Sequence, residues 1–112
     1  MRFNYRKKYM ELQRSAYENG KLQLIVKEVG KPGIKFTITT QTKGYDAPTG
    51  YIPIKVWEEN KDIVEVLYNS GIFTDTGHRA DVNIDGKIFT IEYWEFINPS
   101  TLQHIPIAVE PL

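Results

Sequence analysis

The clearest chemical pattern in the sequence is a run of oxygen-bearing side chains in residues 81–92, DVNIDGKIFTIE. A twelve-residue calcium loop places oxygen ligands at positions one, three, five and twelve and a glycine at position six. Those positions are held here by Asp81, Asn83, Asp85, Glu92 and Gly86. A calcium loop also needs a helix on each side, and FTDTGHRA, before the run, lacks the apolar spacing of a helix.

The same run also fits a β-hairpin whose two-residue turn is Asp85-Gly86, a pair that strongly favours such turns. Counting outward from the turn creates one mostly apolar face, which pairs Val82 with Phe89, Ala80 with Ile91 and His78 with Tyr93. The other face pairs Asp81 with Thr90 and Arg79 with Glu92. The β-branched and aromatic residues of KIFTIEYWEF favour strands. We therefore predict the hairpin, with calcium binding by Asp81, Asn83, Asp85 and Glu92 as the less favoured alternative.

Other catalytic patterns are sparse. The chain has no cysteine, its histidines are His78 and His104, and it has neither a G-x-S-x-G nor a phosphate-binding glycine loop. On a strand, neighbouring side chains point to opposite faces, so His78 and Asp81 do not converge on one ligand. We predict a protein that is not an enzyme and that needs no cofactor or metal.

The N-terminal half indicates strands. In residues 9–29, Leu22, Leu24 and Val26 alternate with polar residues after Asn19-Gly20, and a loop of residues 18–20 would pair Ala16 with Leu22 and Leu12 with Val26. A helix over residues 5–17 remains the alternative. Residues 34–40, IKFTITT, indicate a third strand.

The middle of the chain indicates a loop followed by a helix. Residues 42–53 are rich in glycine and proline and hold Tyr45 and Tyr51, so we predict a loop whose tyrosines contact a partner. Residues 58–70 have helical spacing, with Gly71 as the stop and one apolar side formed by Ile63, Val64, Leu67 and Tyr68. The last residues, 98–112, contain three prolines and indicate an irregular segment or an edge strand.

These elements predict a single α+β domain over residues 1–112, an antiparallel sheet of about five or six strands with one helix packed on one face. The expected order is β-β-β-(β)-α-β-β. Apolar residues make up 41% and charged residues 25% of the 112, an ordinary globular composition. No apolar run suggests a membrane span or a secretory signal, so we expect a cytoplasmic protein with no membrane partner.

Charge is unevenly distributed along the chain. Residues 1–56 hold eleven Lys/Arg and four acids, a balance of +7, and residues 57–112 hold three Lys/Arg and ten acids, a balance of −7. We favour pairing of the two halves across one fold. The alternative is nucleic-acid binding by one lysine face, Lys21, Lys27 and Lys35, with RFNYRKKY as a basic arm containing Arg6, Lys7 and Lys8.

Three stretches carry a resemblance to a known family. The run LYNSGIFTDTGHR, the aromatic strand ending YWEF and the N-terminal YENGKLQLIV are similar to a small bacterial family of unknown function that is frequent on phages and conjugative elements. Thr76-Gly77 with Arg79 is the sharpest motif. The resemblance implies a compact α+β fold and an accessory role on mobile DNA, without a catalytic residue. The charged DVNIDG turn and the lack of cysteine depart from the family.

Two functions follow as expectations. The first is a non-enzymatic interaction protein that binds a protein partner or a second copy of itself, with Tyr45, Tyr51 and Trp94 as contact residues. An accessory factor or inhibitor encoded by a mobile element is its concrete form. The second is nucleic-acid binding through the basic half.

Overall fold

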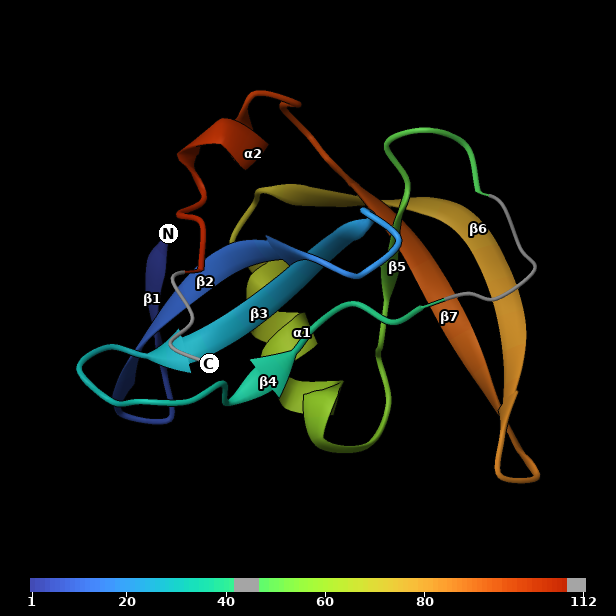
Figure 1. Cartoon of the computed structure of the whole chain (residues 1–112), viewed down its shortest axis with the longest axis horizontal. Helices are drawn as coiled ribbons and strands as arrows, with labels where there is room; N and C mark the ends of the chain where they lie inside the picture. The colour runs from blue at the N-terminus through green and yellow to red at the C-terminus, as the bar shows by residue number, and fades with distance from the viewer. Residues whose placement is uncertain (42–46, 109–112) are drawn as a thin grey trace.

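Two antiparallel sheets and one nine-residue helix form the fold in this computed structural model, which describes residues 1–41 and 47–108. The first sheet has the order β1-β2-β3-β4 and the second the order β5-β7-β6 (Figure 1). Two elements are short helices, η1 (Glu58–Asn60) and α2 (Thr101–His104). The others are β1 (Arg2–Tyr5), β2 (Lys8–Ala16), β3 (Leu22–Glu28), β4 (Phe36–Thr37), β5 (Ile52–Ile54), α1 (Lys61–Asn69), β6 (Phe73–Ile84) and β7 (Lys87–Phe96). The predicted α+β class with antiparallel pairing is confirmed.

The β2–β3 hairpin has the predicted register, with Leu12 opposite Val26 and Ala16 opposite Leu22. Gly20 takes a φ of +83°, which the loop requires and which glycine adopts without strain. The alternative of a helix over residues 5–17 is therefore wrong. A two-residue turn with positive φ at Arg6 and Lys7 joins β1 to β2, so the predicted basic arm is part of the sheet.

The prediction of a single sheet with five or six strands is wrong in detail, because the strands divide into a set of four and a set of three. The two sheets meet where Thr39 bridges Ile54, and the N–H of Lys55 donates to the carbonyl of Ile38 at 2.8 Å. Residues 42–53 were predicted to form a loop, yet β5 begins at Ile52. Pro53 fits in this strand because its carbonyl accepts from Thr40 on the side away from β7.

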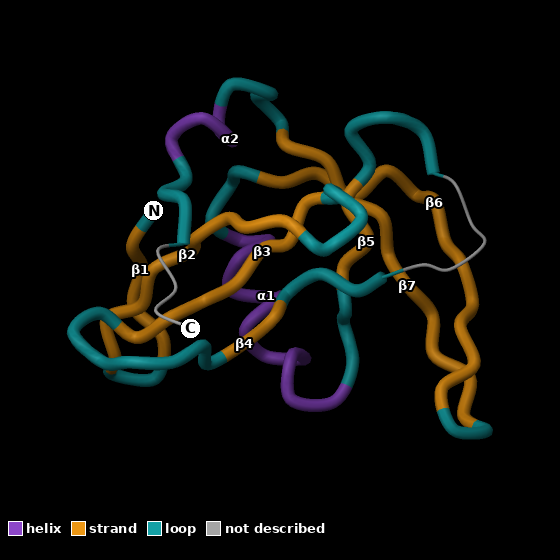
Figure 2. Tube along the Cα trace, viewed as in Figure 1, coloured by secondary structure: helices purple, strands orange, loops and turns teal. Residues whose placement is uncertain are grey.

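Helix α1 buries the predicted apolar side. Ile63, Val64 and Leu67 are buried, whereas Tyr68 is 41% exposed. Gly71, with a φ of +86°, follows the end of the helix as predicted. In Figures 1 and 2, α1 lies behind β3. Its buried residues share one core with both sheets, formed by Met10, Leu12, Leu24, Val26, Ile38, Ile52, Ile54, Phe73, Trp94 and Ile105.

The β6–β7 hairpin is confirmed around its Asp85-Gly86 turn. Ile84 pairs with Lys87, and the predicted pairs from Val82–Phe89 to Arg79–Glu92 are all present. The prediction that His78 pairs with Tyr93 is wrong, because the register shifts in a bulge between Asp75 and Arg79. The hairpin projects from the body of the molecule, at the lower right of Figure 1.

The C-terminal segment packs beside β2. A short helix, α2, which the sequence did not predict, leads to Ile107, and Ile107 forms a parallel bridge with Arg14. The Arg14 N–H donates to the carbonyl of Pro106, and its carbonyl accepts from Ala108, both at 2.8 Å. Within residues 1–41 and 47–108, no helix has the length and apolar character needed to cross a membrane.

Candidate functional site

A groove of about 710 Å³ opens between the β2–β3 turn, the approach to β5, the end of β7 and α2. These segments are far apart in the chain and meet only because β7 lies beside β5 and the C-terminal segment returns to β2. The described residues that line the groove are Tyr17, Asn19, Lys21, Leu22, Thr40, Gln41, Ala47, Pro48, Thr49, Gly50, Tyr51, Ile52, Pro53, Tyr93, Glu95, Phe96, Pro99 and Leu102.

The groove is mainly apolar and aromatic, with a few polar groups at defined positions. Volumes of about 300–1,000 Å³ and apolar linings are typical of binding sites. Tyr17 is held in place by a 2.9 Å hydrogen bond between its hydroxyl and Thr39 Oγ1. Burial raises the pKa of Tyr17 above its ordinary value.

Tyr51, which the sequence predicted as a contact residue, lines this groove. Its ring meets the edge of the His78 ring at a centroid distance of 5.9 Å, and His78 meets Tyr93 at 5.1 Å. The three rings therefore form a row in which His78, in the bulge of β6, lies between Tyr51, just before β5, and Tyr93, on β7. Such edge-to-face contacts orient aromatic rings. His78 thus contacts both tyrosine rings.

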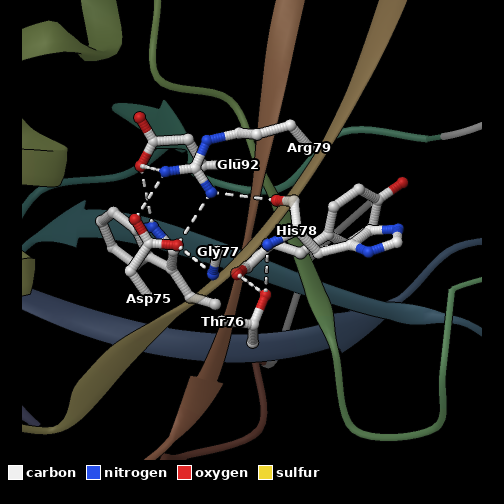
Figure 3. A network of polar contacts seen from close by, with 8 residues as sticks. Asp75, Thr76, Gly77, His78, Arg79 and Glu92 are labelled. Carbon is white, nitrogen blue, oxygen red and sulfur yellow. Dashed lines mark hydrogen bonds and ion pairs between the residues drawn. The ribbon is translucent and has the colours of Figure 1, made fainter.

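The bulge that carries His78 is stabilised by its own side chains (Figure 3). Gly77, at a φ of +80°, donates its N–H to Asp75 Oδ1 at 2.9 Å. Thr76 Oγ1 donates to the carbonyl of Tyr93 at 2.6 Å and accepts from the N–H of His78 at 3.1 Å. These bonds satisfy backbone groups that the register shift removes from the β6–β7 pairing.

Arg79, the last residue of the bulge, contacts the carboxylates of Asp75 and Glu92. Its guanidinium donates to both oxygens of Asp75, at 2.8 and 2.6 Å, and lies 3.9 Å from Glu92 Oε1. Figure 3 shows this guanidinium between the two carboxylates. The hydrogen bonds from Arg79 lower the pKa of Asp75, and the bond to Asp75 raises the pKa of Arg79.

A pH titration tests this ion pair. Since the folded-state pKa of Asp75 is depressed, the pair stabilises the fold above the unfolded-state pKa, and its contribution is lost as the pH falls through the folded-state pKa. We expect the carboxyl carbon-13 shift of Asp75 to titrate below its ordinary midpoint, and to move back toward it in Arg79→Gln. Arg2→Gln, which removes a guanidinium bound to Glu11 instead, is the control. An unchanged Asp75 midpoint in Arg79→Gln would contradict the pairing.

The other two predicted contact residues do not form the groove. Trp94 is 3% exposed and packs on Phe73, at a centroid distance of 5.5 Å, and on Tyr68, at 5.1 Å. Its Nε1 donates to Glu92 Oε1 at 3.1 Å. The prediction that Trp94 contacts a partner is therefore wrong, because the side chain belongs to the core. Tyr45 lies outside the described residues.

The residues of the calcium alternative lie on strands and at a hairpin turn. Asp81 Oδ1 accepts from Thr90, and Asn83 Oδ1 accepts from the N–H of Gly86. Glu92 faces Arg79 and Trp94. In the part of the chain that the structure describes, no three His, Asp or Glu side chains cluster as metal ligands would. The two helices that a calcium hand needs are replaced by β6 and β7.

The basic residues of the nucleic-acid alternative are divided between several places. Arg6 pairs with Asp62, and Lys8 Nζ lies 3.8 Å from Glu28 Oε1. Lys7 is exposed in the β1–β2 turn. Lys21 lines the groove at one end of β3, Lys27 lies opposite Glu11 on β2, and Lys35 lies at the other end of β3.

A second cavity, of about 550 Å³, is lined by both basic and acidic side chains. The basic ones are Arg6, Lys8, Lys35 and Lys61, and the acidic ones are Glu28, Glu58, Glu59 and Asp62. The formal charges of these four basic and four acidic side chains cancel.

Sequence reasoning identified Tyr51 but missed most of the groove. Tyr17 and Leu22 were assigned to a hairpin, and nothing in the sequence indicated that Phe96 and Leu102 lie beside them.

No family model matches the chain, and neither the curated proteins nor the solved structures contain a significant match. The resemblance to a mobile-element family therefore stays a prediction.

Proposed function

We propose that this protein is a non-enzymatic interaction protein that binds an extended segment of a protein partner in the groove. The observation that carries the proposal is the concave surface lined by Tyr17, Tyr51, Phe96 and three prolines, with the buried Tyr93 beneath them. Tyrosines provide large, rigid contact areas at low cost in conformational entropy. Aromatic grooves are a common means of holding proline-rich and apolar peptides.

The polar groups of the groove support binding in preference to a reaction. Among the residues that the structure describes, the ionisable groups that line the groove are Lys21, Glu95 and three tyrosines, of which Tyr93 is buried, so this part of the lining has one charge of each sign. A charge of each sign suits a peptide with both apolar and charged side chains. In line with the resemblance, an accessory factor or inhibitor carried by a mobile element is the concrete form that we propose.

Selection from a random peptide display library tests the groove. We expect enriched peptides to be rich in aromatic, aliphatic and proline residues, and to lose at least tenfold in affinity for Tyr51→Ala, since interface aromatic residues often contribute more than about 1.4 kcal/mol. Tyr9→Ala is the matched control, because Tyr9 is 49% exposed on β2 and does not line the groove. Peptides that bind Tyr51→Ala as tightly as the native chain, or no enrichment at all, would contradict the proposal.

A further inference from the structure

The outer edge of β6 is open for strand pairing. β6 is the last strand in the order β5-β7-β6, so within the described residues no strand pairs with its other side. β5 pairs only with residues 92–94 of β7, and the hairpin beyond this point, residues 79–91, is named the arm here. The arm extends away from the sheet at the lower right of Figure 1.

The hydrogen-bonding pattern of the arm identifies which backbone groups face outward. In a hairpin with a two-residue turn, the residues that flank the turn are hydrogen bonded and the following pairs alternate. Ile84 and Lys87 flank the turn, so Val82 and Ala80 bond inward to β7. The N–H and C=O groups of Arg79, Asp81 and Asn83 consequently point to the open edge. Unpaired groups of this kind are a template for another strand.

We propose that a second copy of this chain occupies the open edge, with β6 antiparallel to β6 about a twofold axis at Val82. Val82 then faces Val82 of the second copy, and Ala80 faces Ile84 of the second copy. Ile84 is 39% exposed in the single chain. Because Phe89 lies opposite Val82 within each arm, four apolar side chains line up across the four strands. Apolar cross-strand pairs of this type stabilise a sheet.

Charge and strand geometry select this register among the symmetric ones. With the axis at Val82, Asp81 faces Asn83 of the second copy, and no two carboxylates face each other within the paired strands. An axis at Asp81 would oppose Asp81 to Asp81, and an axis at Asn83 would oppose Asp81 to Asp85. Like charges that face each other across strands are destabilising. An axis at Ala80 would require residues of the bulge to pair with the second copy, and the strand is irregular there.

This interface is separate from the proposed function. None of residues 79–84 lines the groove, and Tyr51 lies outside the arm. A variant that disrupts one surface therefore leaves the other available. Failure of self-pairing would not affect the peptide-binding proposal, and failure of peptide binding would not affect self-pairing.

Single cysteines test the register, because the chain has none of its own. Val82 and its counterpart form a non-hydrogen-bonded pair, whose Cα atoms are about 4.5 Å apart, within the range for a disulfide. Mild oxidation of Val82→Cys should therefore give a species of twice the 13.0 kDa chain mass on a non-reducing gel. Ala80→Cys is the matched control, because the two Ala80 residues are offset by four positions, about 13 Å along the strand. Cross-linking of Ala80→Cys as fast as Val82→Cys would overturn the register.

Proline substitutions test the edge in the full chain. Asp81→Pro removes an outward N–H of β6, and Ile88→Pro removes an outward N–H on the opposite side of the same arm, so both keep the hydrogen bonds inside the hairpin. In sedimentation velocity we expect the native chain and Ile88→Pro to form dimers and Asp81→Pro to be monomeric. A native chain that is monomeric at every concentration, or loss of the dimer in both variants, would overturn the proposal.

Discussion

Replacing Trp94 with alanine should lower the free energy of unfolding by about 3–5 kcal/mol, the cost of removing a large aromatic side chain from a packed core. Trp94 is 3% exposed, and it fills the space between Phe73, on β6, and Tyr68, on α1. The substitution would leave a cavity between the helix and the three-stranded sheet. It would also remove the hydrogen bond from the indole to Glu92. Urea unfolding followed by far-ultraviolet circular dichroism measures the loss.

The other tryptophan provides the control. Trp57 is only partly buried, and its ring stacks on Phe89 at a centroid distance of 5.0 Å. Trp57→Ala should therefore cost clearly less than Trp94→Ala, since it removes a contact with the middle of the arm and opens no core cavity. If Trp94→Ala kept full stability and lost only peptide binding, the placement of Trp94 in the core would be wrong.

Replacing Asn60 with aspartate should destabilise the fold by about 3–5 kcal/mol at neutral pH, the cost of an uncompensated buried charge. Asn60 is fully buried at the start of α1. Its Nδ2 donates to the carbonyls of Thr37, at 2.8 Å, and Lys55, at 3.0 Å. The helix is thereby linked to the segments where the two sheets meet. A carboxylate would face these two acceptors with no proton to offer.

The pH dependence of Asn60→Asp has a defined sign. Burial and the facing carbonyls raise the folded-state pKa of the new carboxyl above its unfolded-state value of about 3.9. The loss of stability should be smallest below this value and should grow as the pH rises. Asn69→Asp is the matched control, because Asn69 is an exposed asparagine at the end of the same helix. Equal losses in the two variants at pH 7 would contradict the proposed role of Asn60.

Both long hairpins were predictable because their information is local. Asn19-Gly20 and Asp85-Gly86 specify tight turns, and alternation of apolar and polar residues then determines each register. The helix was predictable for the same reason, since Ile63, Val64 and Leu67 recur at helical spacing before Gly71. The predicted registers of β2–β3 and of β6–β7 beyond the bulge agree with the structure residue by residue.

The candidate site was much less predictable. Tyr51 was identified because aromatic residues in a glycine- and proline-rich segment suggest a contact surface. Trp94 looked equally suitable, but an aromatic residue on a strand gives no sign of which side will be covered by a helix. The bulge was missed because the register was counted from Asp85-Gly86 on the assumption of regular backbone pairing. In the bulge, hydrogen bonds made by the side chains of Thr76 and Asp75 replace backbone hydrogen bonds between β6 and β7.

The sequence by itself determined the antiparallel hairpins, the single main helix and the α+β class, because each depends on residues within a few positions of one another. Only the tertiary structure decided how the strands divide into two sheets, where β5 pairs, which aromatic residues are buried and where the groove opens. These features depend on contacts between distant segments, such as Thr39 with Ile54 and Arg14 with Ile107. Such contacts form because the apolar faces of separate elements must share one core. A local pattern predicts which face of an element is apolar, but it does not predict which other element will pack against that face.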